Sequence, residues 1–225
     1  MGKGKELWDE LRSVFSGRGS RLLDSTIPPL LFILVNPLAG VTIALWFALG
    51  AAGIFALWRI GQKQSLVYAL GGLGATVLAA VLVKLSGSGT GFFLPGLISG
   101  AVTVLLCVVS VALNRPLVAW TSYLARRWTL AWYWHPQVLP AYNEVTIGWG
   151  VAFAARLLVE FWFYQQEATG ALGAARLILG WPFTLLLLIV TYLYGIWRLG
   201  KLGGPSVSEF DQEQAPPWEG QRKGF

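Results

Sequence analysis

Six long apolar runs, separated by short polar segments, dominate the hydrophobic pattern of the chain. A helix that crosses a bilayer needs about 20 consecutive, mostly apolar residues, so each run is expected to be one membrane span. The sequence therefore predicts an all-α, polytopic membrane protein with a six-helix transmembrane domain over residues 22–198. The predicted spans are residues 22–38, 41–58, 66–85, 92–113, 145–166 and 173–197.

The connections between the runs predict how neighbouring helices are joined. Asn36-Pro37 is expected to end the first run, and the short linker that follows predicts a tight antiparallel hairpin with the second. The loop from Ser86 to Gly91 alternates glycine with serine and threonine. It lacks the lysine of a phosphate-binding P-loop and is interpreted as a flexible connector.

Three segments lie outside the six spans. Residues 1–21 have apolar residues at helical spacing, which indicates either a cytoplasmic amphipathic helix on the membrane surface or a partly ordered tail. Residues 116–143 mix tryptophan, tyrosine and arginine, a composition typical of a helix in the lipid headgroup layer. Residues 199–225 form a polar cytoplasmic tail, which is expected to be disordered beyond Pro205.

Composition supports the membrane class and limits the partners. The chain is 55% hydrophobic and 12% charged, whereas a soluble domain has roughly 25% charged residues. The net charge of +6 comes from basic residues placed between apolar runs, which argues against a nucleic-acid-binding face. The lipid bilayer is therefore the expected partner, and we expect no binding to nucleic acid.

The distribution of lysine and arginine predicts the orientation. If the N-terminus is inside, Lys84 is the only basic residue of the outer loops, and Arg156 and Arg176 lie within spans. All other basic residues then fall on inner segments, in agreement with the positive-inside rule. The sequence predicts a multi-pass membrane protein with both termini cytoplasmic.

Residues with recognisable catalytic or metal-binding chemistry are scarce. His135 is the only histidine and Cys107 the only cysteine. Multi-histidine metal sites and disulfides are therefore excluded, and no serine, histidine and acid set can be assembled. We expect no enzyme activity, no catalytic residues, no metal and no cofactor.

Three charged residues inside the last two runs are the strongest functional signal. Arg156 and Glu160 follow Gly148 and Ala152 at four-residue steps, so all four share one side of a helix. In the next run a similar stripe is formed by Arg176, Gly180 and Thr184 and is extended by Thr191 and Gly195. An ionised group near the bilayer centre costs roughly 2.5 to 3.5 kcal/mol, so such groups face protein or water and find partners. Glu160 lies between the two arginines in predicted depth, which predicts that both guanidiniums share its carboxylate.

The candidate polar site of Arg156, Glu160 and Arg176 has three interpretations at this stage. It is an ion-pair network that fixes helix register, an anion-attracting or proton-coupled site, or a pocket for a lipid headgroup. The second interpretation, an anion-attracting or proton-coupled site, makes the protein a transporter or channel for a small solute or ion. The alternative function is that of a structural or accessory membrane protein. It would pack against a second copy or another membrane protein through small-residue faces, formed by Gly71, Ala75, Ala79, Gly96 and Gly100.

Several sequence blocks resemble a known family. They are Phe92-Phe93-Leu94-Pro95-Gly96, Asn114-Arg115-Pro116-Leu117-Val118, the Ala141-Tyr142 to Trp149 entry with Arg156, Ala175-Arg176-Leu177, and Leu179-Gly180-Trp181-Pro182. From about Asp24 to Trp197 the chain resembles the bacterial multi-pass membrane proteins known as domain of unknown function 3159. The resemblance implies a multi-pass protein of the bacterial plasma (inner) membrane without an assigned activity, and it carries over no catalytic residue.

Overall fold

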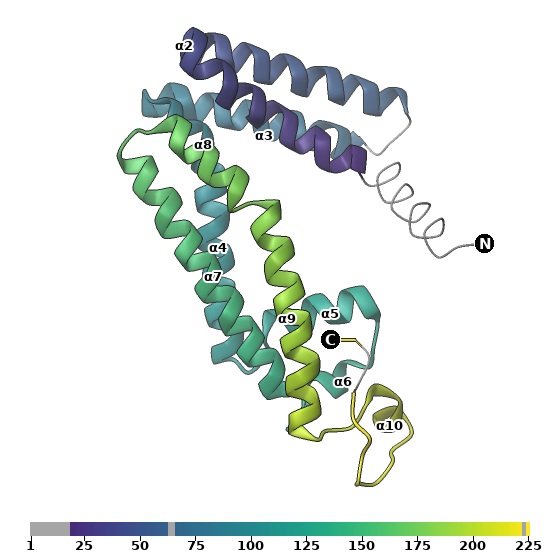
Figure 1. Ribbon diagram of the computed structural model, residues 1–225. Coiled ribbons are helices and arrows are strands. Elements are labelled where there is room, and N and C mark those ends of the chain that lie inside the picture. The colour runs from purple at the N-terminus through teal and green to yellow at the C-terminus, as the bar shows by residue number, and fades with distance from the viewer. Residues whose placement is uncertain (1–18, 63–65, 222–223) are drawn as a thin grey trace, which may run out of the picture. The chain divides into compact units, whose positions relative to one another are not determined.

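The computed structural model describes residues 19–62, 66–221 and 224–225, and in this part of the chain every regular element is a helix. Most of the predicted amphipathic segment 1–21 lies outside the described residues. The elements are labelled in Figure 1. They are α2 (Gly19–Gly61), α3 (Leu66–Ser86), the 3₁₀ helix η1 (Gly89–Phe93), α4 (Leu94–Ala112), α5 (Leu117–Arg126), α6 (Leu130–Tyr133), α7 (Leu139–Gln165), α8 (Thr169–Ile178), α9 (Trp181–Leu202) and α10 (Val207–Asp211).

The chain forms two compact units. Of the described residues, those up to residue 95 and residues 163–174 form the first unit, and those of 96–162 and 175–225 form the second. The helices α4, α7 and α8 each begin in one unit and end in the other.

The α2 ribbon reverses direction at Gly40, which separates two helical halves (Figure 1). Gly40 has φ of 82° and ψ of 167°, a conformation that glycine adopts without steric cost. The hairpin predicted between the first two runs is therefore present. The sequence suggested that Asn36-Pro37 ends the first run, but the helix continues through it to Gly40. The reversal needs a positive φ, and the proline ring fixes φ near −65°, so the chain turns at the glycine instead.

The core of the first unit joins both halves of α2 to α3 and η1. Phe32, Ala44, Leu45 and Val83 are buried in it, and the Phe32 ring stacks on Phe92 with centroids 4.2 Å apart. The residues of η1 are all buried, so the second half of the segment interpreted as a flexible connector, Gly89 to Gly91, is packed, while Ser86 and Gly87 are exposed. Ser88 is the N-cap of η1, and its side chain accepts a hydrogen bond from the Thr90 backbone N–H.

The second unit has an aromatic core built from the segment expected in the headgroup layer. Trp132, Tyr133 and Tyr142 are fully buried there, with Tyr133 and Tyr142 edge to face at 5.1 Å. These side chains therefore pack against protein, which the tryptophan and tyrosine content alone could not distinguish from a lipid interface. Burial raises the pKa of the Tyr133 hydroxyl, which lies 3.2 Å from the Ser122 hydroxyl.

The polar tail differs from the disordered segment predicted beyond Pro205. Ser206 and Glu209 form a capping box that starts α10, and the Glu209 carboxylate also accepts backbone N–H groups of Glu219 and Gly220. Hydrogen bonding, first from Ser206, lowers the pKa of Glu209 to about 2. The tail is fixed to the aromatic core because Trp132 Nε1 donates to the Pro205 carbonyl at 2.9 Å and the Phe225 ring stacks on Tyr142.

Four helical stretches are long and apolar enough to cross a membrane, which indicates a membrane protein. They are Ile27–Gly61, Gly89–Ala112, Leu139–Gln165 and Thr169–Leu202 among the described residues, and the apolar helix Leu70–Ser86 is shorter. Large apolar side chains such as Leu105, Leu158 and Leu186 are more than half exposed, as expected for helices that face lipid.

Candidate functional site

Arg156 and Glu160 are positioned by α7 and lie one helical turn apart on the same face. Arg156 Nε donates to Glu160 Oε1 at 2.7 Å. Residues i and i+4 of a helix are surface neighbours, so this contact follows directly from the sequence spacing. Among the described residues, the side-chain partner of Arg156 is Glu160. This bond uses one of the five N–H donors of the Arg156 guanidinium.

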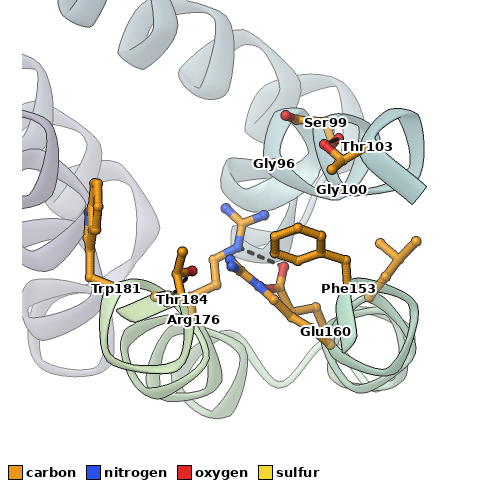
Figure 2. A pocket seen from close by; sticks show the side chains of 12 residues that line it. Gly96, Ser99, Gly100, Thr103, Phe153, Glu160, Arg176, Trp181 and Thr184 are labelled. Atoms are coloured by element: carbon orange, nitrogen blue, oxygen red, sulfur yellow. Dashed lines mark hydrogen bonds and ion pairs between the residues drawn. The ribbon is translucent and has the colours of Figure 1, made fainter. Parts of the chain in front are cut away.

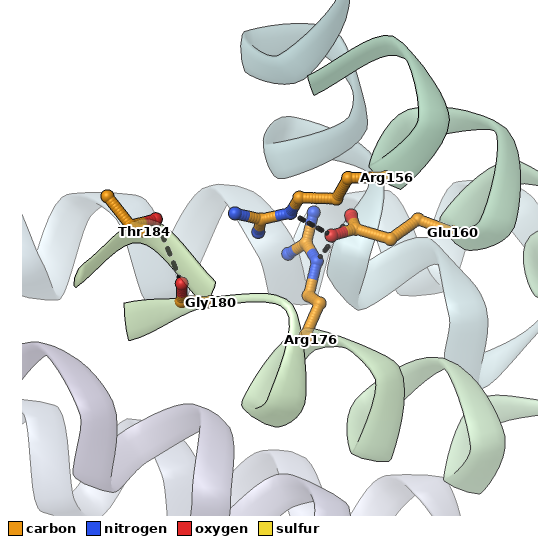
Figure 3. A network of polar contacts seen from close by, with 5 residues as sticks. All are labelled: Arg156, Glu160, Arg176, Gly180 and Thr184. Atoms are coloured by element: carbon orange, nitrogen blue, oxygen red, sulfur yellow. Dashed lines mark hydrogen bonds and ion pairs between the residues drawn. The ribbon is translucent and has the colours of Figure 1, made fainter. Parts of the chain in front are cut away.

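Arg176 reaches the same carboxylate from the last turn of α8. Its Nε donates to Glu160 Oε2 at 3.0 Å, so each carboxylate oxygen is bound to a different guanidinium (Figure 3). The predicted sharing of Glu160 by two arginines is confirmed. A cation in the last turn of a helix also interacts favourably with the negative end of the helix dipole.

The three charged side chains differ in exposure, and this difference determines the character of the site. The Glu160 side chain is 3% exposed, whereas those of Arg156 and Arg176 are 26% and 22% exposed. Charge-assisted bonds from both arginines offset the cost of burying the carboxylate. The part of the cluster that remains accessible is therefore cationic, with two guanidiniums against one carboxylate.

Gly96 on α4 provides the space that the Arg176 guanidinium occupies. A Cβ built at Gly96 would overlap the NH1, NH2 and Cζ atoms of Arg176. Figure 2 shows this guanidinium directed towards Glu160 and the α4 segment that carries Gly96. Any side chain at Gly96 would thus compete with Arg176 for the same volume.

Both guanidiniums line a pocket of about 430 Å³ within the second unit. Its walls come from α4, α7, the end of α8 and the start of α9, and its polar groups besides the three charges include the hydroxyls of Ser99, Thr103 and Thr184 (Figure 2). Phe153 and Trp181 add aromatic surface. The sequence placed Thr184 on the polar stripe but missed Ser99, Thr103, Phe153 and Trp181, because such residues also occur in spans without any pocket.

The run predicted as one span, residues 173–197, is interrupted beside the site. It consists of the end of α8 and most of α9, joined through Leu179 and Gly180. Gly180 has a non-helical backbone (φ −81°, ψ −120°), and a Cβ there would lie 2.5 Å from the Arg176 carbonyl oxygen. The Gly180 carbonyl accepts hydrogen bonds from the backbone N–H and hydroxyl of Thr184, at 3.0 and 2.9 Å. The predicted span lies within the apolar stretch Thr169–Leu202, but it contains two helices. The sequence did not show the interruption because Gly180 fits a helical pattern and Pro182 is acceptable in the first turn of a new helix.

A second ion pair lies between α7 and α9, outside the pocket. Arg198 donates from Nε and NH2 to the two oxygens of Glu144, at 2.7 and 2.6 Å, and Tyr194 donates to Glu144 at 2.7 Å. The Arg198 side chain is 25% exposed, nearly the same as Arg156, while Glu144 is 34% exposed. This pair joins two helices without contributing to the pocket, so it is a matched control for the site.

The long apolar helices place the chain in the class of all-helical membrane proteins. Within that class it belongs to the family described as "Protein of unknown function (DUF3159)", whose model matches residues 17–196. The resemblance found in the sequence is confirmed by this match. Neither a curated protein nor a solved structure matched the chain.

Proposed function

We propose that this protein binds a small anion in the pocket at Arg156 and Arg176 and conducts or transports it across the membrane. The observation that carries the proposal is that two partly exposed guanidiniums line one pocket while their only carboxylate partner in it, Glu160, is buried. Fixed cations in a site of low dielectric attract anions more strongly than the same cations in water. The Ser99 hydroxyl lines the same pocket and can donate to an anion that has lost its hydration shell. The hydroxyls of Thr103 and Thr184 donate to the backbone carbonyls of Ser99 and Gly180.

The site lies beside an interruption between two helices. In membrane proteins, non-helical backbone at membrane depth is tolerated where it is buried in protein or lines a cavity, and discontinuous helices are common at transport sites. Gly180 both interrupts the run and lines the pocket. This coincidence supports a transport pathway more than a purely structural ion pair.

We also propose six membrane crossings with both termini cytoplasmic, in a bacterial plasma membrane. Each half of α2 is close to the roughly 20 residues that a span requires, and α3, α4, α7 and α9 complete the set. The lysine and arginine distribution supports the orientation. A cysteine placed at Ser88 is expected to react with a membrane-impermeant thiol reagent from outside the cell, and one placed at Gln62 is not. The reverse labelling would overturn the orientation.

Flux through the purified, reconstituted protein tests the transport function. Liposomes containing the wild type are expected to pass at least one anion of a panel comprising chloride, phosphate and small carboxylates. Arg156→Gln and Arg176→Gln should each reduce that flux about tenfold or more, because a hydrogen bond to a charged group contributes roughly 1.5 to 3 kcal/mol.

Arg198→Gln is the matched control for the flux experiment. It removes an equally exposed guanidinium from an ion pair between α7 and α9, but this guanidinium does not line the pocket. Its flux should equal that of the wild type. A folded wild type that passes no anion of the panel, or equal losses in Arg156→Gln and Arg198→Gln, would refute the transport function.

The alternative function, packing against another membrane protein or a second copy, is favoured by one observation on α3. Gly71 and Ala75 are exposed, and within the described residues no atom lies within 4 Å of a Cβ built at Gly71. This small-residue face is open to a partner helix. An oligomer in detergent that dissociates on Gly71→Leu, together with an absence of flux, would support this function over transport.

A further inference from the structure

A second cavity in the second unit, of about 780 Å³, has a composition unlike that of the anion pocket. Most of its lining is apolar and comes from α4, α7 and α9, including Leu188, Ile189 and Leu193. These three helices belong to stretches apolar enough to cross a membrane. A cavity of this size and lining accommodates an apolar ligand, and within a bilayer the apolar molecules at hand are lipid acyl chains.

The cavity is lined by one cationic side chain among the described residues. Arg126 is its only charged lining residue among the described part of the chain, and it ends α5, which lies between two candidate spans. Its Nε donates to the Phe225 backbone oxygen at 3.0 Å, and its guanidinium lies over the Trp128 ring at 4.8 Å. These contacts hold the side chain in place and use one of its five N–H donors, which leaves others for a phosphate oxygen.

The lining also includes a polar group without a partner. Trp149 lines the cavity, and its indole N–H is buried and makes no hydrogen bond within the described residues. An unpaired buried donor is costly, so this part of the lining is a polar position that the protein itself leaves unsatisfied. Thr121 and Thr191 add hydroxyls to the same lining.

From this arrangement we propose that the cavity is a specific site for an anionic phospholipid, with an acyl chain between α4, α7 and α9 and the phosphate group paired with Arg126. Apolar lining comes from the spanning helices and from α5, and the single cation comes from α5, a segment between spans. Among the described lining residues none is acidic, which favours an anionic headgroup over a zwitterionic one. The cavity shares Thr103 and Phe153 with the anion pocket but contains neither Arg156 nor Arg176, so the lipid site does not depend on transport.

Lipid retention by the purified full-length protein tests the site. The protein is reconstituted in nanodiscs with equal amounts of phosphatidylglycerol and phosphatidylcholine of identical acyl chains, and retained lipids are counted by native mass spectrometry. The wild type should retain phosphatidylglycerol in preference, by about fivefold, the factor associated with one basic residue near anionic lipid. Arg126→Gln should abolish this preference but keep the retained neutral lipid.

Two further variants distinguish the site from general surface effects. Arg127→Gln removes the neighbouring exposed charge, which does not line the cavity, and should keep the preference. Ala125→Phe, at an exposed lining position, should fill the cavity and reduce retention of both lipids. Equal loss of preference in Arg126→Gln and Arg127→Gln, or undiminished retention in a folded Ala125→Phe variant, would overturn the proposal.

Discussion

Replacing Glu160 with glutamine is expected to lower the free energy of unfolding by about 3 kcal/mol, because removal of one partner from a buried ion pair leaves the other charges uncompensated. The carboxylate is 3% exposed and is bound by both Arg156 and Arg176. Glutamine has nearly the same shape but no charge, and only one of its two terminal atoms accepts a hydrogen bond. The change is measured as a shift in the midpoint of thermal or denaturant unfolding in detergent.

The pair formed by Glu144 and Arg198 provides the control for this prediction. Glu144 is 34% exposed, so Glu144→Gln should cost no more than about 1 kcal/mol. The double variant Glu160→Gln with Arg156→Gln should be destabilised by less than the sum of its single changes. Glu160→Gln alone leaves the charges of Arg156 and Arg176 unpaired, and the double variant removes one of these two charges. Similar destabilisation by Glu160→Gln and Glu144→Gln would show that burial of the central carboxylate has no special energetic role.

The sequence predicted the centre of the site because its chemistry is local and costly. Arg156 and Glu160 are i and i+4 on one helix, and a charge in an apolar run requires a partner wherever the run lies. The contact of Arg176 with Glu160 followed from the predicted depth of the two helices. These steps need only helix geometry and the cost of an unpaired charge.

The order of the tail could not be predicted in the same way, because it depends on packing between segments distant in sequence. The Phe225 ring lies where a side chain at position 195 would be, and it stacks on Tyr142 of the aromatic core. A tail rich in proline and glycine suggests disorder when such partners are unknown. The glycine at position 195 was part of a recognised small-residue stripe, but the stripe does not reveal which group fills it.

The same ambiguity affected Gly96 and Gly100, whose four-residue spacing was interpreted as a helix-packing face. In the structure the two glycines have different neighbours. A Cβ at Gly100 would lie 3.4 Å from Leu157 Cδ1, an ordinary packing contact, whereas a Cβ at Gly96 would overlap the Arg176 guanidinium. Small residues at helical spacing therefore leave room for a charged side chain as well as for a partner helix.

Gly96→Ala is accordingly expected to displace Arg176 from Glu160, to destabilise the protein by about 2 kcal/mol, as is typical of overpacking, and to reduce anion flux. Gly100→Ala lies one turn further along α4 and lines the same pocket, yet it should leave stability and flux close to wild type. Unfolding midpoints and liposome flux measure both effects. The double variant Gly96→Ala with Arg176→Gln should be less destabilised than the sum of its single changes, because the shorter side chain vacates the contested space. Equal losses at Gly96 and Gly100 would instead mean that both glycines serve helix packing alone, and that Arg176 holds its place without the space at Gly96.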